Sequence, residues 1–371
     1  MDILNQNYLI LTILIILIYS SISSSFLTPY VISFGERFKI LDYPSLRKNH
    51  KKPIVSIGGI SLLLPYISII IFILLLNNLE IISINNVNKI ITLGCISILY
   101  FLIGLIDDIY RLSPWPRLFF QSIFSFLIWN NGINIKHLDF SIFNQSYPIL
   151  NIPDSISIIF NIIWIVGITN AINWVDGIDG LAASVSCLIS LGLIPISIAN
   201  NNILIALISA SLCGCCIGFL FHNSYPAKIH MGDSGSFFLG FNLASLSLLG
   251  IEKLQFNNIE THSPLILLAI LAVPSLDMAA VIFQRILDSK SPFFADRRHL
   301  HHKFLNMGFS CNKTLIIICI LNFWSISIAL YLTPVSFSKV ILAFSTILLT
   351  LLGLFLFNSK KLKNQKDNIY R

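Results

Sequence analysis

The chain has 371 residues, of which 55% are hydrophobic and only 11% are charged, whereas a soluble domain carries about 25% charged residues. So few charges cannot cover the surface of a soluble protein of this length, so the composition excludes a soluble enzyme, a disordered chain and a nucleic-acid-binding protein. The net charge is +7, but the placement of the basic residues is more informative than their number.

Apolar runs long enough to cross a bilayer, about 20 residues each, recur along the chain. We expect eleven transmembrane helices, at residues 8–28, 54–76, 90–106, 118–131, 156–172, 180–199, 203–221, 235–251, 264–284, 314–333 and 340–357. The first run has no basic segment before it and no clear cleavage site after it, so it is not expected to be a signal peptide. Residues 132–155 are polar and predict an external loop or small hairpin. The fold class is therefore an all-α integral membrane protein, a polytopic bundle.

Lysine and arginine gather on one side of these spans. Of the 24 basic residues, only four (Lys89, Lys136, Lys253 and Lys339) fall on the opposite side, which leaves 20. Because cytoplasmic loops carry the excess of Lys and Arg, the richer side is expected to be cytoplasmic. The N-terminus is then outside, the C-terminus is inside, and residues 358–371 form a basic cytoplasmic tail. This arrangement requires an odd number of spans, which agrees with eleven.

Adjacent carboxylates mark the inner end of the third expected span, at Asp107 and Asp108, with Arg117 following. Neighbouring carboxylates repel, so holding them together suggests a metal ion, another cation or a shared proton. A solvated helix end with an ordinary acidic cap is the alternative.

Four polar residues follow at a spacing of three: Asn170, Asn173, Asp176 and Asp179. Residues three apart share a helix face, so we expect two amides and two carboxylates on one surface. Glycines beside the two aspartates allow a ligand to approach the backbone. Such an oxygen-rich set is the kind that Mg²⁺ accepts, and a capped helix–turn–helix is the alternative.

The segment from His230 to Ser236 contains Gly-Asp-Ser-Gly, with its aspartate at Asp233, directly before an apolar run. Asp and Ser are favoured at a helix N-cap, and the same geometry offers amide N–H groups to a phosphate. The sequence leaves both readings open.

Histidines and basic residues are concentrated near the end of the ninth span, at Arg298, His299, His301 and His302. This cluster predicts an anion-binding patch. The histidines are too crowded to surround one zinc ion, and a surface for lipid headgroups would need Lys and Arg but not three histidines. In the first basic loop, Lys48 has either a functional or a purely topological role.

In order and in sidedness, these motifs closely resemble the polyprenyl-phosphate N-acetylhexosamine-1-phosphate transferase superfamily, glycosyltransferase family 4, over about residues 40–310. His-Leu-His-His at 299–302 resembles the bacterial branch that uses UDP-N-acetylglucosamine and undecaprenyl phosphate. The peptidoglycan branch, which transfers phospho-N-acetylmuramoyl-pentapeptide, is the alternative. On this resemblance residues 1–371 form a single transmembrane transferase domain.

The resemblance implies an Mg²⁺-dependent phosphotransferase, for which Mn²⁺ can substitute. It would transfer a sugar-1-phosphate from a UDP-N-acetylhexosamine to undecaprenyl phosphate and release UMP. The product would start a lipid-linked cell-envelope glycan such as O-antigen, lipopolysaccharide or teichoic acid. The enzyme would be a multi-pass protein of the bacterial plasma membrane, its active site facing the cytoplasm. Its partners would be the two substrates and the bilayer, with no nucleic acid; a homodimer is compatible with this.

The resemblance also implies residue roles. Asn173 and Asp233 would ligate the metal, while Asp107 would orient or deprotonate the lipid phosphate with Asp108 supporting it. The catalytic Asp176, with Asp179, would hold the metal shell and the uridine. The nucleotide-sugar would also be bound by Asn170, His230, Arg298, His299, His301 and His302, and the lipid phosphate by Lys48 and Arg117.

Two departures from the family pattern concern His230 and Arg117. Many members have Phe at the first position, and an imidazole would stack less strongly on uracil. Many have Lys at the second, and Arg keeps the charge.

A polytopic transporter is the alternative from another class of protein. Its best support is Asp277 beside Pro274 in the ninth span, because transporters place ionisable groups near the membrane midplane.

Overall fold

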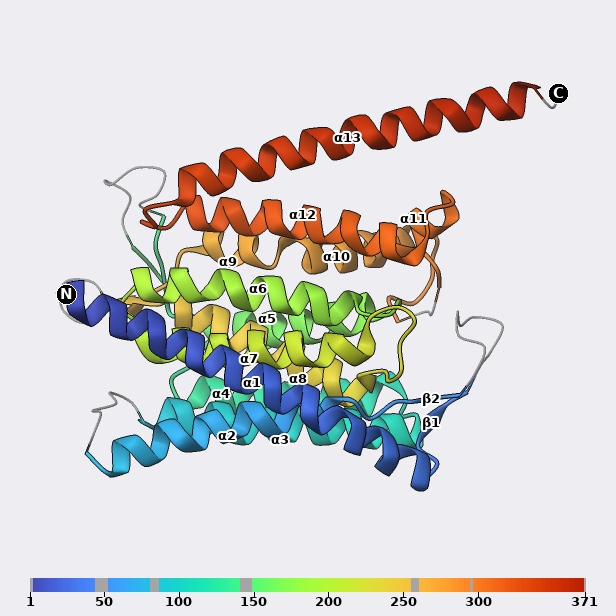
Figure 1. The fold of residues 1–371 in the computed structure, drawn as a ribbon. Coiled ribbons are helices and arrows are strands. Elements are labelled where there is room, and N and C mark those ends of the chain that lie inside the picture. Colours follow the sequence, from blue (N-terminus) through green and yellow to red (C-terminus); the bar gives the residue numbers. More distant parts are fainter. Residues whose placement is uncertain are drawn as a thin grey trace.

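The computed structural model describes residues 3–43, 53–80, 87–140, 149–254, 260–293 and 296–369, and these residues are overwhelmingly α-helical (Figure 1). Their helices are α1 (Ile3–Arg37), α2 (Gly59–Asn78), α3 (Val87–Tyr110), α4 (Pro114–Asn130), α5 (Asp154–Val175), α6 (Leu181–Ala199), α7 (Ile203–Asn223), α8 (Gly232–Ile251), α9 (Pro264–Ile270), α10 (Ala272–Leu287), α11 (Leu300–Asn306), α12 (Cys311–Tyr331) and α13 (Ser338–Ile369). Three antiparallel hairpins pair β1 (Leu41–Asp42) with β2 (Ile54–Val55), β3 (His137–Leu138) with β4 (Leu150–Asn151), and β5 (Lys253–Leu254) with β6 (Glu260–Thr261).

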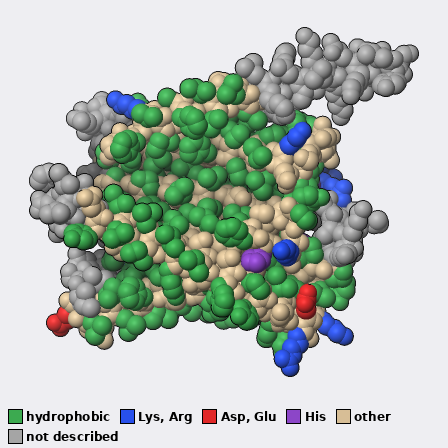
Figure 2. All heavy atoms as spheres, in the orientation of Figure 1, with side chains coloured by type: hydrophobic (Ala, Val, Ile, Leu, Met, Phe, Trp, Pro, Cys, Tyr) green, Lys and Arg blue, Asp and Glu red, His purple; other side chains and the backbone are tan. Residues whose placement is uncertain are grey.

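Helices run along most of every expected span, so the all-α, multi-pass class is confirmed. Eight of the described helices are long and apolar enough to cross a membrane, and α9 with α10 would make a ninth. Two helices are too short to be counted as spans by length alone: α4 has 17 residues, and the apolar stretch of α13 is Ser338–Gly353. The count of eleven spans therefore stays a prediction, and so does the orientation of the chain in the membrane. Hydrophobic side chains cover the side of the bundle in Figure 2, as a lipid-facing surface requires.

The ninth expected span is broken rather than continuous. The helices α9 and α10 meet at Leu271 with a bend of 83°. Pro274 lies in the first turn of α10 and has no amide proton for a helical bond to the preceding turn. The break turns α10, which carries Asp277, away from the line of α9.

The two ends of the bundle differ in what their loops carry. The end we call the motif end holds the hairpin β1–β2 and the loops 111–113, 176–180, 224–231 and 288–299, at the right of Figure 1. Most of the basic side chains visible in Figure 2 lie there. The other end carries β3–β4, which confirms the hairpin expected within residues 132–155.

Helix α8 lies at the centre of the bundle and is buried from Ser234 to Ile251. Glycines let its neighbours approach its backbone. A Cβ atom on Gly104 of α3 would lie 2.3 Å from the carbonyl oxygen of Asp233, and one on Gly240 of α8 would lie 2.6 Å from Cα of Thr169 on α5. Small residues allow such contacts between membrane helices. The close contact at Gly104 places the C-terminal end of α3 directly against the first turn of α8.

The first prediction concerns this contact. Gly104→Ala should destabilise the protein by about 1–3 kcal/mol, because the added methyl group meets backbone atoms that cannot move aside easily. The midpoint of thermal unfolding in detergent would report the loss. Gly353→Ala in α13, where a Cβ atom would meet nothing within 4 Å, is the control. Equal midpoints for both variants and the parent protein would contradict the packing described.

Candidate active site

The carboxylate of Asp108 caps the first turn of α8. Its Oδ1 accepts the amide proton of Asp233 at 2.7 Å, and its Oδ2 accepts that of Ser234 at 3.0 Å. The first amides of a helix have no partner within the helix, and a negative charge at this end is favoured by the helix dipole. The two amides that the sequence left open for a phosphate are therefore already bonded to Asp108.

The neighbouring Asp107 is buried and holds Arg117. Its Oδ2 lies 2.5 Å from Nη1 of the arginine, and its Oδ1 accepts the amide proton of Leu112 at 2.7 Å. The same Nη1 lies 3.9 Å from Oδ2 of Asp233. The guanidinium carbon lies 5.9 Å from the centre of the Phe237 ring, close enough for a cation–π contact. One cation is thus fixed between two carboxylates from α3 and α8.

The predicted metal ligands Asn173 and Asp233 lie side by side. The amide nitrogen of Asn173 donates to Oδ1 of Asp233 at 2.6 Å and to the hydroxyl of Ser236 at 2.9 Å. A half-turn of the amide would bring its carbonyl oxygen to the same place. These oxygen donors fit Mg²⁺, which is commonly held by one or two carboxylates together with substrate phosphates. Among the described residues no three His, Cys, Asp or Glu side chains gather into a complete metal cage.

The motif with a spacing of three does not form one helix face, so that expectation is wrong. Helix α5 ends at Val175, and the next residues turn, with Gly180 at a φ of +75°. Asn170 donates to Oε1 of Gln121 on α4 at 2.8 Å, whereas Asp179 accepts the amide proton of Ala227 at 2.9 Å. The early end of the helix therefore sends these side chains toward three different partners: α4, α8 and the loop 224–231.

The imidazole of His230 lies between two carboxylates. Its Nε2 is 3.6 Å from Oδ1 of Asp179, and its Nδ1 is 3.8 Å from Oδ2 of Asp42 on β1. Burial disfavours its charge, but the carboxylates of Asp179 and Asp42 and the nearby Asp176 raise the pKa of His230 to about 9. Burial likewise raises the pKa of Asp176 to about 6, although the charge of His230 opposes this. A parallel bridge between Val55 and Ile229 joins the β1–β2 hairpin to this loop.

The histidine motif packs against the end of α5. The ring of His299 lies 5.4 Å from that of Trp174, edge to face, and 5.8 Å from that of His301, stacked. A Cβ atom on Gly177 would lie 2.1 Å from Nε2 of His301, so only glycine leaves room for this ring. Burial, with the neighbouring histidines, lowers the pKa of His301 to about 3, and burial also lowers the pKa of His302. His301 is therefore neutral, and no described residue bonds its Nε2.

Contacts bring five of the predicted site residues into one group. Direct contacts link Asp107, Arg117, Asp233 and Asn173, with Asp108 holding the helix start beneath them. Arg298 instead pairs with Asp288 and Asp296. Asn170 donates a hydrogen bond to Gln121 on α4, and Lys48 lies outside the described residues.

The chain is similar to known proteins of one family. The sequence model described as Glycosyl transferase family 4 matches residues 89–251. The chain is 30% identical to the decaprenyl-phosphate N-acetylglucosaminephosphotransferase of Mycobacterium leprae, over 81% of the chain and 78% of that protein. The chain belongs to glycosyl transferase family 4.

Two further relatives mark different branches of the family. The chain is 29% identical to the probable undecaprenyl-phosphate N-acetylglucosaminyl 1-phosphate transferase of Bacillus subtilis, over 93% of the chain and 88% of that protein. It is 30% identical to a phospho-N-acetylmuramoyl-pentapeptide-transferase of Prochlorococcus marinus, over 88% of the chain and 90% of that protein.

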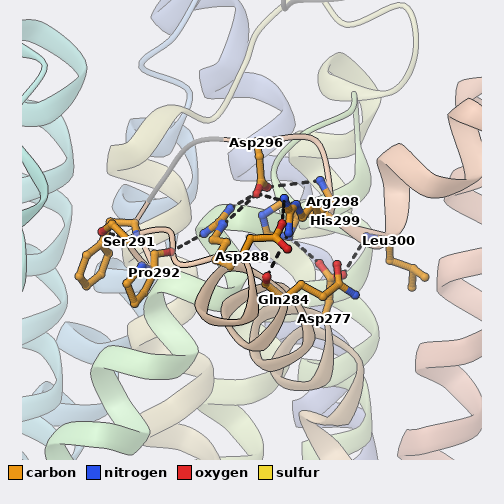
Figure 3. Close-up of polar contacts among 11 residues, drawn as sticks. Asp277, Gln284, Asp288, Ser291, Pro292, Asp296, Arg298, His299 and Leu300 are labelled. Carbon is orange, nitrogen blue, oxygen red and sulfur yellow. Dashed lines mark hydrogen bonds and ion pairs between the residues drawn. The ribbon is translucent and has the colours of Figure 1, made fainter.

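In this glycosyl transferase, the loop that carries the histidines is held by a network that the sequence did not reveal (Figure 3). The buried Arg285 donates to both oxygens of Asp296, at 3.2 and 3.0 Å, and to the carbonyl of Pro292. Its guanidinium carbon lies 4.9 Å from the ring centre of Trp174. A planar guanidinium suits both a fork of two bonds and stacking on an aromatic ring. Arg285 therefore ties the loop 288–299 to the end of α5.

Asp277, the best support for a transporter, anchors the histidine motif. Its Oδ2 lies 2.9 Å from Nδ1 of His299, and its Oδ1 accepts the amide proton of Leu300 at 2.8 Å. The sequence marked Asp277 as unusual, because it is a carboxylate inside an expected span. It did not reveal the partner, His299, which lies 22 residues further along the chain. These contacts account for the buried charge without an ion pathway.

The second prediction concerns the charge on His230. A pKa raised from 6.5 to about 9 means that the folded state binds this proton more tightly than the unfolded chain does. The resulting stabilisation is complete below pH 6.5 and is lost as the pH rises through about 9. His230→Gln should therefore lower the unfolding midpoint by on the order of 2 °C at pH 6.5, and this difference should shrink above pH 9. A difference that stays constant with pH would contradict a charged His230.

Proposed function

We propose that this glycosyl transferase transfers N-acetylglucosamine-1-phosphate from UDP-N-acetylglucosamine to undecaprenyl phosphate. An oxygen of the lipid phosphate forms a bond to the β-phosphorus of the nucleotide sugar, the bond from that phosphorus to UMP breaks, and UMP leaves. The observation that carries the proposal is the junction of α3, α4, α5 and α8, where Asn173 and Arg117 both contact Asp233. The names of the B. subtilis and M. leprae relatives support transfer of an N-acetylglucosamine phosphate to a polyprenyl phosphate, which is undecaprenyl phosphate in the first and decaprenyl phosphate in the second.

Phosphoryl transfer depends on positioning and on neutralising charge rather than on covalent chemistry by the protein. Both substrates are anions, so the site must hold cations beside its carboxylates. Arg117 supplies a fixed positive charge at the junction. The neutral His301, its Nε2 against Gly177, can donate to or accept from the nucleotide sugar without adding charge.

Asn173 and Asp233 would hold Mg²⁺, for which Mn²⁺ can substitute. When bound, this ion lowers the cost of bringing an anionic acceptor to an anionic diphosphate. Asp108 supports the site indirectly, because it fixes the first turn of α8 and with it the backbone of Asp233. Asp176 and Asp179 lie in the loop directly after α5 and would hold the metal shell and the uridine.

The position of the site fits its two substrates. The junction lies at the motif end of the bundle, where most of the basic side chains visible in Figure 2 lie. By the positive-inside rule this end faces the cytoplasm. A lipid phosphate can reach it from the bilayer and a UDP-sugar from the cytosol. Both substrates meet at the cytoplasmic face of the bacterial plasma membrane, and the product would start a lipid-linked cell-envelope glycan.

Release of UMP by the purified protein tests the function. With undecaprenyl phosphate and Mg²⁺, UDP-N-acetylglucosamine should give UMP and a lipid-linked diphospho-sugar, both lost on chelation. UDP-N-acetylgalactosamine and UDP-N-acetylmuramoyl-pentapeptide belong in the same panel, because the similarity to the P. marinus protein favours the latter as the second candidate. Turnover of the pentapeptide alone would replace our proposal with that one.

The third prediction concerns the carboxylate at the junction. Asp233→Asn should lower kcat at least about 100-fold, because the site loses a charge that binds the divalent ion. The variant should still accumulate in the membrane. Asp154→Asn, which alters an aspartate of the opposite end paired with Lys136, is the control and should keep full activity. Near-normal turnover by Asp233→Asn would remove this residue from the proposed site.

The fourth prediction separates substrate binding from headgroup binding by the histidines. His301→Ala should raise KM for the UDP-sugar or lower kcat about 10-fold, because a hydrogen-bonding group beside Gly177 is lost. His137→Ala on the opposite hairpin is the control, since that imidazole contacts Asn151 far from the motif end. Unchanged kcat and KM in His301→Ala would leave the motif with a role in lipid headgroup binding only.

A further inference from the structure

Asp107 is more deeply enclosed than its neighbour Asp233. The side chain of Asp107 is 4% exposed, whereas that of Asp233 is 34% exposed. Both oxygens of Asp107 already accept hydrogen bonds, one from Leu112 and the other from Arg117. A group that takes a proton from a substrate needs an oxygen within hydrogen-bond reach of it. The enclosure of Asp107 and its pairing with Arg117 leave little of either oxygen open to a substrate.

Asp108 is not better placed to take that proton. Each of its oxygens accepts an amide proton from the first turn of α8. Adjacent carboxylates at the end of α3 thus have separate tasks: one fixes a helix start and the other fixes a cation. This division also explains how two neighbouring negative charges are held together, since each is matched by donors of its own.

Arg117 is the more accessible member of its ion pair. Its side chain is 23% exposed, and a guanidinium carries five N–H donors, of which the contact with Asp107 engages few. The planar fork of arginine matches phosphate oxygens well. Asp107 and the Phe237 ring hold the guanidinium where it also approaches Asp233. A phosphate that binds this cation would therefore lie next to the predicted ligands of the metal ion.

The acceptor needs little help to lose its proton. The second pKa of a phosphate monoester is about 6, so most of it is already a dianion at neutral pH. What limits the approach of this dianion is the surrounding negative charge of Asp107, Asp108 and Asp233, and of the diphosphate itself. A fixed cation reduces this electrostatic repulsion, whereas an additional base would not.

We propose that Asp107 is a positioning residue that acts through Arg117: it holds the guanidinium beside Asp233 to receive the phosphate of the lipid acceptor, and it takes no proton from it. The inference rests on the proposed function. It places the acceptor phosphate on the α3–α4 side of the junction. It also means that binding of this phosphate depends on the ion pair of Asp107 with Arg117 rather than on either residue alone.

A double-mutant cycle tests this pairing. The parent protein, Asp107→Asn, Arg117→Gln and the double variant are compared by kcat/KM for undecaprenyl phosphate at saturating UDP-sugar. Asp107→Asn should lower this value about 10- to 100-fold, mainly through KM, because the arginine loses its fixed position. Arg117→Gln should lower it at least as much. The double variant should then lie within about threefold of Arg117→Gln, because residues that act as a unit are not additive.

A separate catalytic role for Asp107 gives a different result. The double variant would then show about the product of the two single losses. The pH profile of kcat supplies a second measurement: Asp107→Asn should keep the same acid limb as the parent, set by the phosphate of the acceptor. Loss of that limb in Asp107→Asn, or multiplicative losses in the cycle, would overturn the proposal.

The control is an ion pair at the opposite end of the bundle. Lys136 and Asp154 lie 2.9 Å apart, and Lys136→Gln and Asp154→Asn should leave kcat/KM unchanged. If Asp107→Asn does not accumulate, an unchanged KM for undecaprenyl phosphate in Arg117→Gln overturns the proposal by itself. Failure of the parent protein to release UMP from any UDP-sugar would instead refute the proposed function, and the inference with it.

Discussion

The arrangement of this protein depends on how the start of a deeply buried helix is satisfied. Helix α8 is enclosed from Ser234 onward, and the amides of its first turn need partners there. Asp108, near the C-terminal end of α3, accepts hydrogen bonds from two of them. Gly104 allows the backbones of α3 and α8 to come into contact. The two hydrogen bonds to Asp108 therefore also fix how far α8 is shifted along its axis relative to α3. The position of Asp233, and hence of the whole junction, follows from it.

A second constraint is the matching of charge at the motif end. Carboxylates from α3, α8, β1 and the loop 176–180 meet there, and each is opposed by a cation or by amide donors. Arg117 lies between Asp107 and Asp233, His230 between Asp42 and Asp179, and Arg285 against Asp296. Buried charges are tolerated in such pairs. The same pairs hold the loops in the positions at which an anionic substrate would bind.

Much of the fold and part of the site could be predicted from the sequence. The apolar runs located the helices, and the polar groups between them marked the loops that meet at one end. The adjacency of Asn173 and Asp233 was expected and is found at 2.6 Å. The shared helix face of residues 170–179 was not found, because a spacing of three predicts a face only where the helix continues, and α5 ends at Val175. The bend between α9 and α10 was missed for a similar reason: a hydropathy pattern does not register a change of direction.

The sequence by itself determined the membrane class, the helices and the residue types available for chemistry, because hydropathy and charge act over neighbouring positions. The tertiary structure decided which atoms of those residues are already engaged. Asp108 meets its partners 125 and 126 positions along the chain, and His299 meets Asp277 across 22. A hydrogen bond forms over about 3 Å of space, and separation in sequence carries no information about that distance until the helices have packed.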